Sequence, residues 1–111
     1  MGIVEVGGAL WKVSNSSFDF LFERLAGRFA GGDPFAEDVS AALETRFLTL
    51  QGSTEGELRD FIHALRQECD ELARLAAEGR STPAIPDYAY FARVLQTLVA
   101  SCESALAGTQ A

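Results

Sequence analysis

The chain has 111 residues, and its 9 basic and 16 acidic side chains give a formal net charge of −7. Hydrophobic residues make up 48% of the chain, which is enough to build a core and excludes general disorder. The charge argues against nucleic acid or an anionic membrane as a partner, because both kinds of binding need an excess of Lys and Arg. The length predicts a single compact domain over residues 1–111.

The first residues lack the basic stretch and apolar run of a secretory signal, and no segment reaches the ~18 consecutive apolar residues of a membrane span. Cys69 and Cys102 fall on the apolar faces of two different predicted helices. Free buried thiols are favoured there over a disulfide. We therefore expect a cytoplasmic protein.

Two short apolar runs at the N-terminus, residues 3–6 and 9–13, flank Gly7 and Gly8. A glycine pair between such runs predicts an antiparallel hairpin, because a two-residue turn needs positive φ angles. The register of this hairpin places Trp11 on its more apolar face. We therefore expect Trp11 to be a core residue.

Apolar side chains at helical spacing then predict two helices. The first begins near Ser16 or Ser17, with Ser16 and Asp19 at the spacing of a capping box, and it ends at the glycines of residues 31–32. In the second helix Asp33 is the expected N-cap and Pro34 the first helical residue, where the missing N–H of proline has no cost.

Residues 46–51 are compatible with two structures. Phe47 and Leu50 extend the apolar face of the second helix, whereas the alternation and the β-forming residues of the segment indicate a strand. We favour the strand, because a lone two-stranded hairpin is marginally stable and a third strand would support it.

The third helix has the clearest sequence signal. Thr54 and Glu57 form a capping box, and the apolar spacing continues to about Glu78, before a stop at Gly79. The other face of this helix is wide and charged, includes Glu68, and is expected to be solvated.

The fourth helix is predicted from about Asp87 to just before Gly108, and residues 108–111 are expected to fray. It is apolar nearly all round, which favours a central place in the fold over a homodimer seam. Together these elements predict an α+β fold with three to four helices packed on a small antiparallel sheet, made of the hairpin and the third strand.

Few side chains suit catalysis or metal binding. His63 is the only imidazole, and no nucleophile motif presents a serine to it. Two cysteines and one histidine do not complete the usual four-ligand zinc site. Asp60 and His63 stand one helical turn apart, but a di-iron site needs that pattern twice. We expect no catalytic residue, no metal, no cofactor and no enzymatic activity.

Acidic side chains near the predicted starts of the second and third helices are the strongest candidates for a binding surface. If the two helix starts are neighbours, their carboxylates form one concentrated patch. Tyr90 lies off the apolar face of the fourth helix and is the aromatic candidate for an exposed contact. The candidate partner-binding residues are Glu37, Asp38, Glu55, Glu57, Asp60 and Tyr90.

In size and charge the chain resembles immunity proteins, which implies an inhibitor or antitoxin that neutralises a basic protein. Our leading hypothesis is a non-enzymatic acidic binding module for such a partner, for example a toxin nuclease whose phosphate site carboxylates can occupy. Acidity that serves solubility alone is the simpler interpretation. A helical homo-oligomer with the fourth helix as dimer seam is the competing class, so monomer and homodimer both remain open. A pocket for a small apolar ligand between the first and fourth helices is a third possibility.

Overall fold

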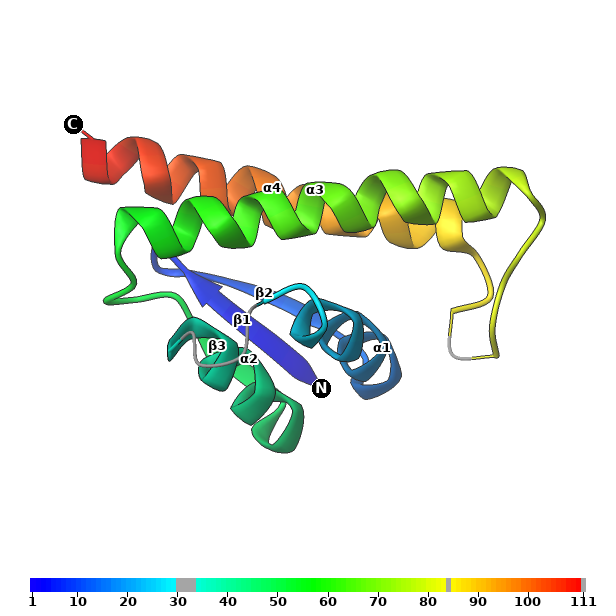
Figure 1. Ribbon diagram of the computed structural model, residues 1–111, viewed down its shortest axis with the longest axis horizontal. Coiled ribbons are helices and arrows are strands. Elements are labelled where there is room, and N and C mark those ends of the chain that lie inside the picture. Colours follow the sequence, from blue (N-terminus) through cyan, green and yellow to red (C-terminus); the bar gives the residue numbers. More distant parts are fainter. Residues whose placement is uncertain (30–33, 84, 111) are drawn as a thin grey trace. The chain divides into compact units, whose positions relative to one another are not determined.

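The computed structural model describes residues 1–29, 34–83 and 85–110, with its elements in the order β1-β2-α1-α2-β3-α3-α4 (Figure 1). Four helices and a three-stranded sheet confirm the predicted α+β fold. The chain forms two compact units, Met1–Ser53 and Thr54–Ala111. The first unit holds the sheet and two short helices, and the second holds two long helices.

The predicted hairpin is confirmed. β1 (Gly2–Val6) pairs antiparallel with β2 (Ala9–Val13). The two turn glycines have φ angles of 58° and 82°, and two positive values in succession are the signature of a type I′ turn. Val4 pairs with Trp11, and both side chains are buried, as the register predicts.

The third strand also forms, but over fewer residues and in the other direction. β3 (Phe47–Thr49) pairs parallel with β1, so the sheet is mixed, in the order β2-β1-β3, rather than antiparallel throughout. The reason is the crossover: the chain leaves β2, passes through two helices and returns to the far edge of β1. Hydrogen bonds from Ile3 N to Arg46 O (2.9 Å) and from Leu50 N to Glu5 O (2.8 Å) fix β3 in place.

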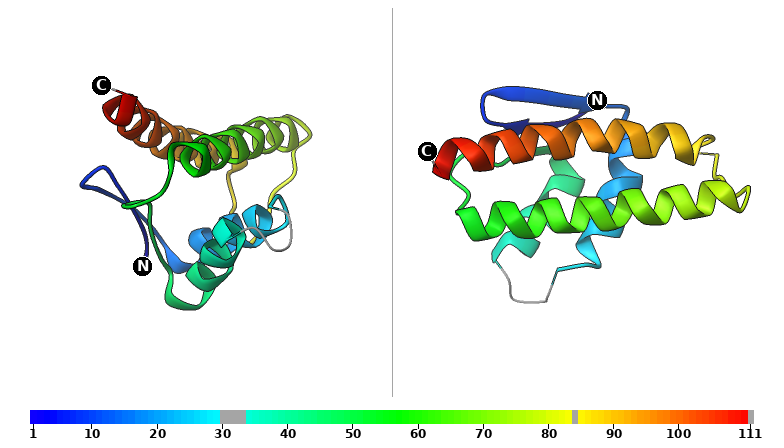
Figure 2. Two further views of the ribbon diagram at one scale, coloured as in Figure 1. Left: turned by 60° about the vertical axis from the view of Figure 1, so that its left-hand side comes forward. Right: turned by 90° about the horizontal axis from the view of Figure 1, so that it is seen from above.

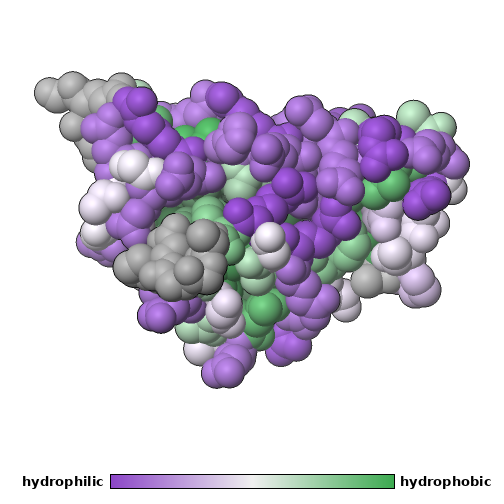
Figure 3. Space-filling view, in the orientation of Figure 1, coloured by the Kyte–Doolittle hydropathy of each residue, from purple (hydrophilic) through white to green (hydrophobic). Residues whose placement is uncertain are grey.

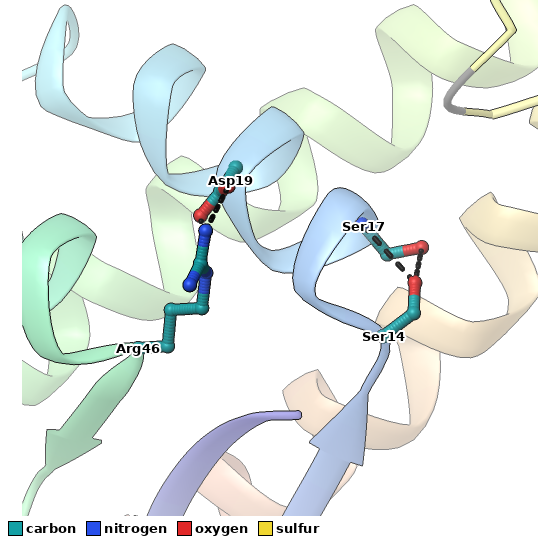
Figure 4. Close-up of polar contacts among 4 residues, drawn as sticks. All are labelled: Ser14, Ser17, Asp19 and Arg46. Atoms are coloured by element: carbon teal, nitrogen blue, oxygen red, sulfur yellow. Dashed lines mark hydrogen bonds and ion pairs between the residues drawn. The ribbon is translucent and has the colours of Figure 1, made fainter.

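The first helix starts earlier and ends sooner than its sequence signals indicate. α1 spans Asn15–Ala26, and Ser14 is its N-cap, with its Oγ accepting a hydrogen bond from Ser17 N at 3.2 Å (Figure 4). The predicted capping box of Ser16 and Asp19 is therefore wrong. The helix stops before the glycines at 31–32, which lie outside the described residues.

Asp19 instead binds the residue that precedes β3. Arg46 donates hydrogen bonds from Nε and Nη2 to the two Asp19 carboxylate oxygens, at 3.2 and 3.0 Å (Figure 4). This bidentate pair raises the pKa of Arg46. It also anchors a residue whose φ of 55° lies in the left-handed region, which is uncommon for any residue other than glycine. The contact thus ties α1 to the entry of β3.

The core of the first unit is built around aromatic rings. Phe18 and Phe22 of α1 are wholly buried and stack with centroids 4.1 Å apart. Phe18 lies so close to β1 that a Cβ built on Gly2 would be 2.3 Å from its side-chain carbons. The absence of a side chain at Gly2 is therefore what admits Phe18.

α2 spans Pro34–Thr45, which confirms the second helix and its first residue, while its expected N-cap, Asp33, lies outside the described residues. Phe35, Val39 and Ala42 recur at spacings of four and three and are buried. That spacing sets one face of α2 inward and leaves the opposite face to solvent.

The second unit is an antiparallel pair of long helices that lie side by side (Figure 2). α3 (Glu55–Ala77) starts with the predicted capping box of Thr54 and Glu57 and stops before Gly79, whose φ is 76°. α4 spans Tyr88–Gln110 and so runs through Gly108, beyond its expected end. Hydrophilic side chains cover the exposed side of α3 (Figure 3).

A methyl group at Gly2 should destabilise the first unit. We expect Gly2→Ala to lower the free energy of unfolding by about 1–3 kcal/mol, because the wholly buried Phe18 cannot move away without disturbing its stack. Gly27→Ala is the matched control, since a Cβ there meets only a carbonyl oxygen at 3.5 Å and the backbone is α-helical. Urea unfolding of both variants is the measurement, and equal stabilities would contradict the close packing of Gly2.

Candidate functional site

Every charged residue of α2 is acidic. Glu37, Asp38 and Glu44 are exposed on it, and the helix contains no Lys, Arg or His. None of the three carboxylates forms a hydrogen bond or ion pair with any other residue that the structure describes. This set, which we call the α2 acidic face, is therefore an uncompensated negative surface.

Glu44 was not among the residues predicted from the sequence. Its signal was available, because it follows Glu37 by seven residues and two helical turns return it to the same side of the helix. It was missed because only acids near the predicted starts of the second and third helices were considered, and Glu44 lies near the end of the second. In the structure Glu44 lies in the last turn of α2.

The acids at the start of α3 are mostly engaged in local contacts. Glu55 accepts a hydrogen bond from Arg59 Nη2 at 2.5 Å, one helical turn away. Glu57 accepts from the backbone N–H of Thr54 at 2.9 Å and is half-buried. Asp60 is exposed and makes no such contact within the described chain. Of these three predicted residues, Asp60 alone keeps its charge uncommitted.

Tyr90 is exposed, as predicted, with 61% of its surface accessible. It lies in the first turn of α4, where its backbone N–H donates to Asp87 Oδ1 at 3.0 Å. Because α3 and α4 run antiparallel, Tyr90 lies at the opposite end of the helix pair from Glu55 and Asp60 (Figure 2). The structure does not bring this aromatic together with the acids of α3.

The six predicted residues are also divided between the two units. Glu37 and Asp38 belong to Met1–Ser53, and the other four belong to Thr54–Ala111. That the two helix starts form one concentrated patch stays a prediction.

Glu68 departs from its predicted environment. It is 1% exposed, whereas the sequence pattern assigned it to the solvated face of the third helix. Its position explains the burial, because it follows Leu65 by three residues and precedes Leu72 by four, and both leucines are wholly buried. No buried side-chain nitrogen or oxygen of the described residues lacks a hydrogen-bond partner, so this carboxylate is satisfied.

Both cysteines are free and buried, which confirms the expectation from their helical positions. Burial, assisted by the charge of Glu103, raises the pKa of Cys102 to about 12. Burial and the neighbouring Asp70 and Glu68 carboxylates also raise the pKa of Cys69, whose thiol lies 3.7 Å from Ala92 O. Neither sulfur has the lowered pKa of a reactive thiolate.

Other kinds of site find little support in the described chain. Its His, Cys, Asp and Glu residues include no group of three or more placed to hold a metal ion. None of its helices combines the length and the apolar character that crossing a membrane requires. Comparisons with protein-family models, with curated proteins and with solved structures found no match to this chain.

The thiols provide a direct test of this burial. At pH 8 we expect iodoacetamide to modify Cys102 roughly 1,000-fold more slowly in the native protein than in guanidinium, because the thiol stays protonated and inaccessible. Mass spectrometry of a Cys69→Ala variant isolates the signal of Cys102. Equal native and denatured rates would contradict the burial of this side chain.

Proposed function

We propose that this protein is a non-enzymatic binding module that docks the α2 acidic face onto a basic protein partner. The observation that carries the proposal is the uncompensated charge of Glu37, Asp38 and Glu44, three exposed carboxylates on a helix without a basic residue. Elsewhere in the described chain many charges are neutralised locally, as in the pairs Arg46–Asp19, Arg59–Glu55 and Arg74–Glu78.

Helix stability accounts for only part of this face. A negative charge in the first turn of a helix is favourable, which gives Glu37 a structural role. Glu44 lies in the last turn, where the partial negative charge of the helix end repels a carboxylate. The dipole of α2 therefore gives no stabilising role to Glu44, and this supports a role for Glu44 in binding a cationic partner.

A net charge of −7 on a chain of this size adds long-range attraction to the local surface. Such a field accelerates association with a basic protein and weakens as salt is added. A nucleic-acid-cutting toxin suits this surface, because its cationic phosphate site accepts carboxylates in place of phosphate oxygens. The finer proposal is therefore an inhibitor or immunity-type protein for such a toxin.

The homo-oligomer with α4 as its seam is the second proposal, and it has less support. Most of the large apolar side chains of α4 are buried, among them Phe91, Leu95 and Leu98. Its exposed positions carry mainly small or polar residues: Ala89, Tyr90, Arg93, Gln96, Thr97, Ala100, Glu103, Ser104, Ala107 and Gly108. Size-exclusion chromatography with light scattering separates the two proposals, because the seam requires a dimer.

The binding test uses two variants with the same change of charge. Glu37→Gln/Asp38→Asn neutralises part of the α2 acidic face, and Glu23→Gln/Asp70→Asn neutralises two other exposed acids that make no ion pair within the described chain. Proteins that co-purify with the wild-type chain from its host are identified by mass spectrometry. We expect a basic protein whose association rate falls about tenfold for the α2 variant and far less for the control.

Three results would contradict the proposal. The co-purified protein could be acidic or neutral, its association rate could be independent of salt, or the two variants could lose the same amount of binding. The last result would indicate that acidity acts through overall charge alone, as the solubility interpretation implies.

A further inference from the structure

The second unit contains an open groove of about 390 Å³ between the first half of α3 and the last turns of α4. Its volume falls within the range of small-molecule sites, toward the lower end. The residues that line it are Arg59, Ile62, His63, Arg66, Glu103, Leu106 and Ala107. No residue of the α2 acidic face contributes to it.

Three nitrogen-bearing side chains of α3 line the groove, and each of its two arginines is paired with one acid. Arg59, His63 and Arg66 follow one another at spacings of four and three, which places them along one face of α3 over ~10 Å. All three side chains are exposed. Glu103 is the one acidic residue in the lining. An anion that enters the groove therefore meets three nitrogen-bearing side chains in a row.

The structure itself shows that these arginines bind carboxylates. Arg59 Nη2 contacts Glu55 Oε1 at 2.5 Å, and Arg66 Nη2 contacts Glu103 Oε2 at 2.9 Å. Each recorded contact uses one terminal nitrogen, whereas a guanidinium carries five N–H donors. The arginines are 56% and 58% exposed, so their remaining donors can reach a second carboxylate.

The other part of the groove is apolar. Leu106 is half-buried and offers carbon surface beside these side chains, whereas Ile62 also lines the groove but is only 5% exposed. Ala107 leaves space next to them because its side chain is a single methyl group. A ligand that satisfies both parts carries one anionic head and a short apolar tail.

We propose that this groove binds a small amphipathic monocarboxylate, with its carboxylate at Arg59, His63 and Arg66 and its tail against Ile62 and Leu106. A carboxylate head matches the partners that both arginines already hold, and its planar pair of oxygens suits the guanidinium fork. The groove is separate from the α2 acidic face, so either site can exist without the other.

Sodium octanoate is the probe, and the full chain labelled with ¹⁵N is the sample. We expect saturable NMR shifts at the backbone amides of Ile62, His63, Glu103 and Leu106. Acetate has the head without the tail and octanol the tail without the charge, so each should bind at least about tenfold more weakly. Inorganic phosphate, an anion without a tail, should also bind more weakly than octanoate.

Two arginine variants locate the head group. Arg66→Gln should weaken octanoate about fivefold, because a charge-assisted hydrogen bond is lost. Arg74→Gln is the matched control, since Arg74 lies on the same helix, is 61% exposed and pairs with Glu78 at 2.6 Å, but does not line the groove. His63→Gln tests the same row without breaking an ion pair, and we expect a smaller loss in the same direction.

The proposal fails if octanoate produces no saturable shifts, or if the shifts lie outside the groove. It also fails if acetate or phosphate binds as well as octanoate, because the tail would then contribute nothing. Equal losses in Arg66→Gln and Arg74→Gln would overturn it as well, since octanoate would then respond only to the net charge of the helix.

Discussion

Burial of one apolar face by each helix is the constraint on which the rest of this structure depends. In α3 the wholly buried Phe61, Leu65 and Leu72 fix which side of the helix points inward. In α2 the buried Phe35, Val39 and Ala42 do the same. Once these faces are buried, the helical repeat determines which charged residues remain in solvent and beside which neighbours they lie. The surface chemistry is thus a consequence of core packing.

The charged faces of α3 and α2 differ in whether a basic side chain lies one helical turn from each acid. On α3 an arginine often stands three or four residues from an acid, so Arg59 pairs with Glu55, and Arg74 with Glu71 and Glu78. α2 itself contains no base, and its three exposed carboxylates pair with no other residue that the structure describes. Exposed pairs add little stability, but they decide where charge remains for a partner. In the groove of the second unit both arginines are paired as well, Arg59 with Glu55 and Arg66 with Glu103 across the helix pair, and their remaining N–H donors stay exposed.

Structural features that depend on only a few neighbouring residues could be predicted from the sequence. The Gly7-Gly8 turn, the capping box of Thr54 and the stop at Gly79 are local features, and each appears as expected. The direction of β3 could not be predicted, because it depends on the path of the chain through two helices. The N-cap of α1 was assigned to the wrong serine because Ser14, Ser16 and Ser17 all lie within one helical turn. Asp19 binds Arg46 instead of capping the helix, and this contact joins residues 27 positions apart in the sequence, so no local pattern predicts it.

The candidate sites could likewise be predicted only in part from the sequence. The acids of α2 can be recognised from the sequence because the helix contains no base. The acids of α3 cannot be told apart from the sequence, because only the structure shows which of them form ion pairs. The charge of Glu68 is typical of a surface residue, whereas its spacing from Leu65 and Leu72 is typical of a core residue. The side chain is buried, as the spacing indicates. The groove depends on the placement of α4 beside α3, which no local pattern contains.

Carboxylate footprinting of the complex is the most direct test of the proposal that the α2 acidic face is the docking surface. Carbodiimide labelling followed by mass spectrometry compares each acid in the free protein and in the protein bound to its basic partner. The account predicts that Glu37, Asp38 and Glu44 become protected, while Glu23 and Asp70 keep their reactivity. Protection that spares α2, or that is equal at all exposed acids, would contradict it.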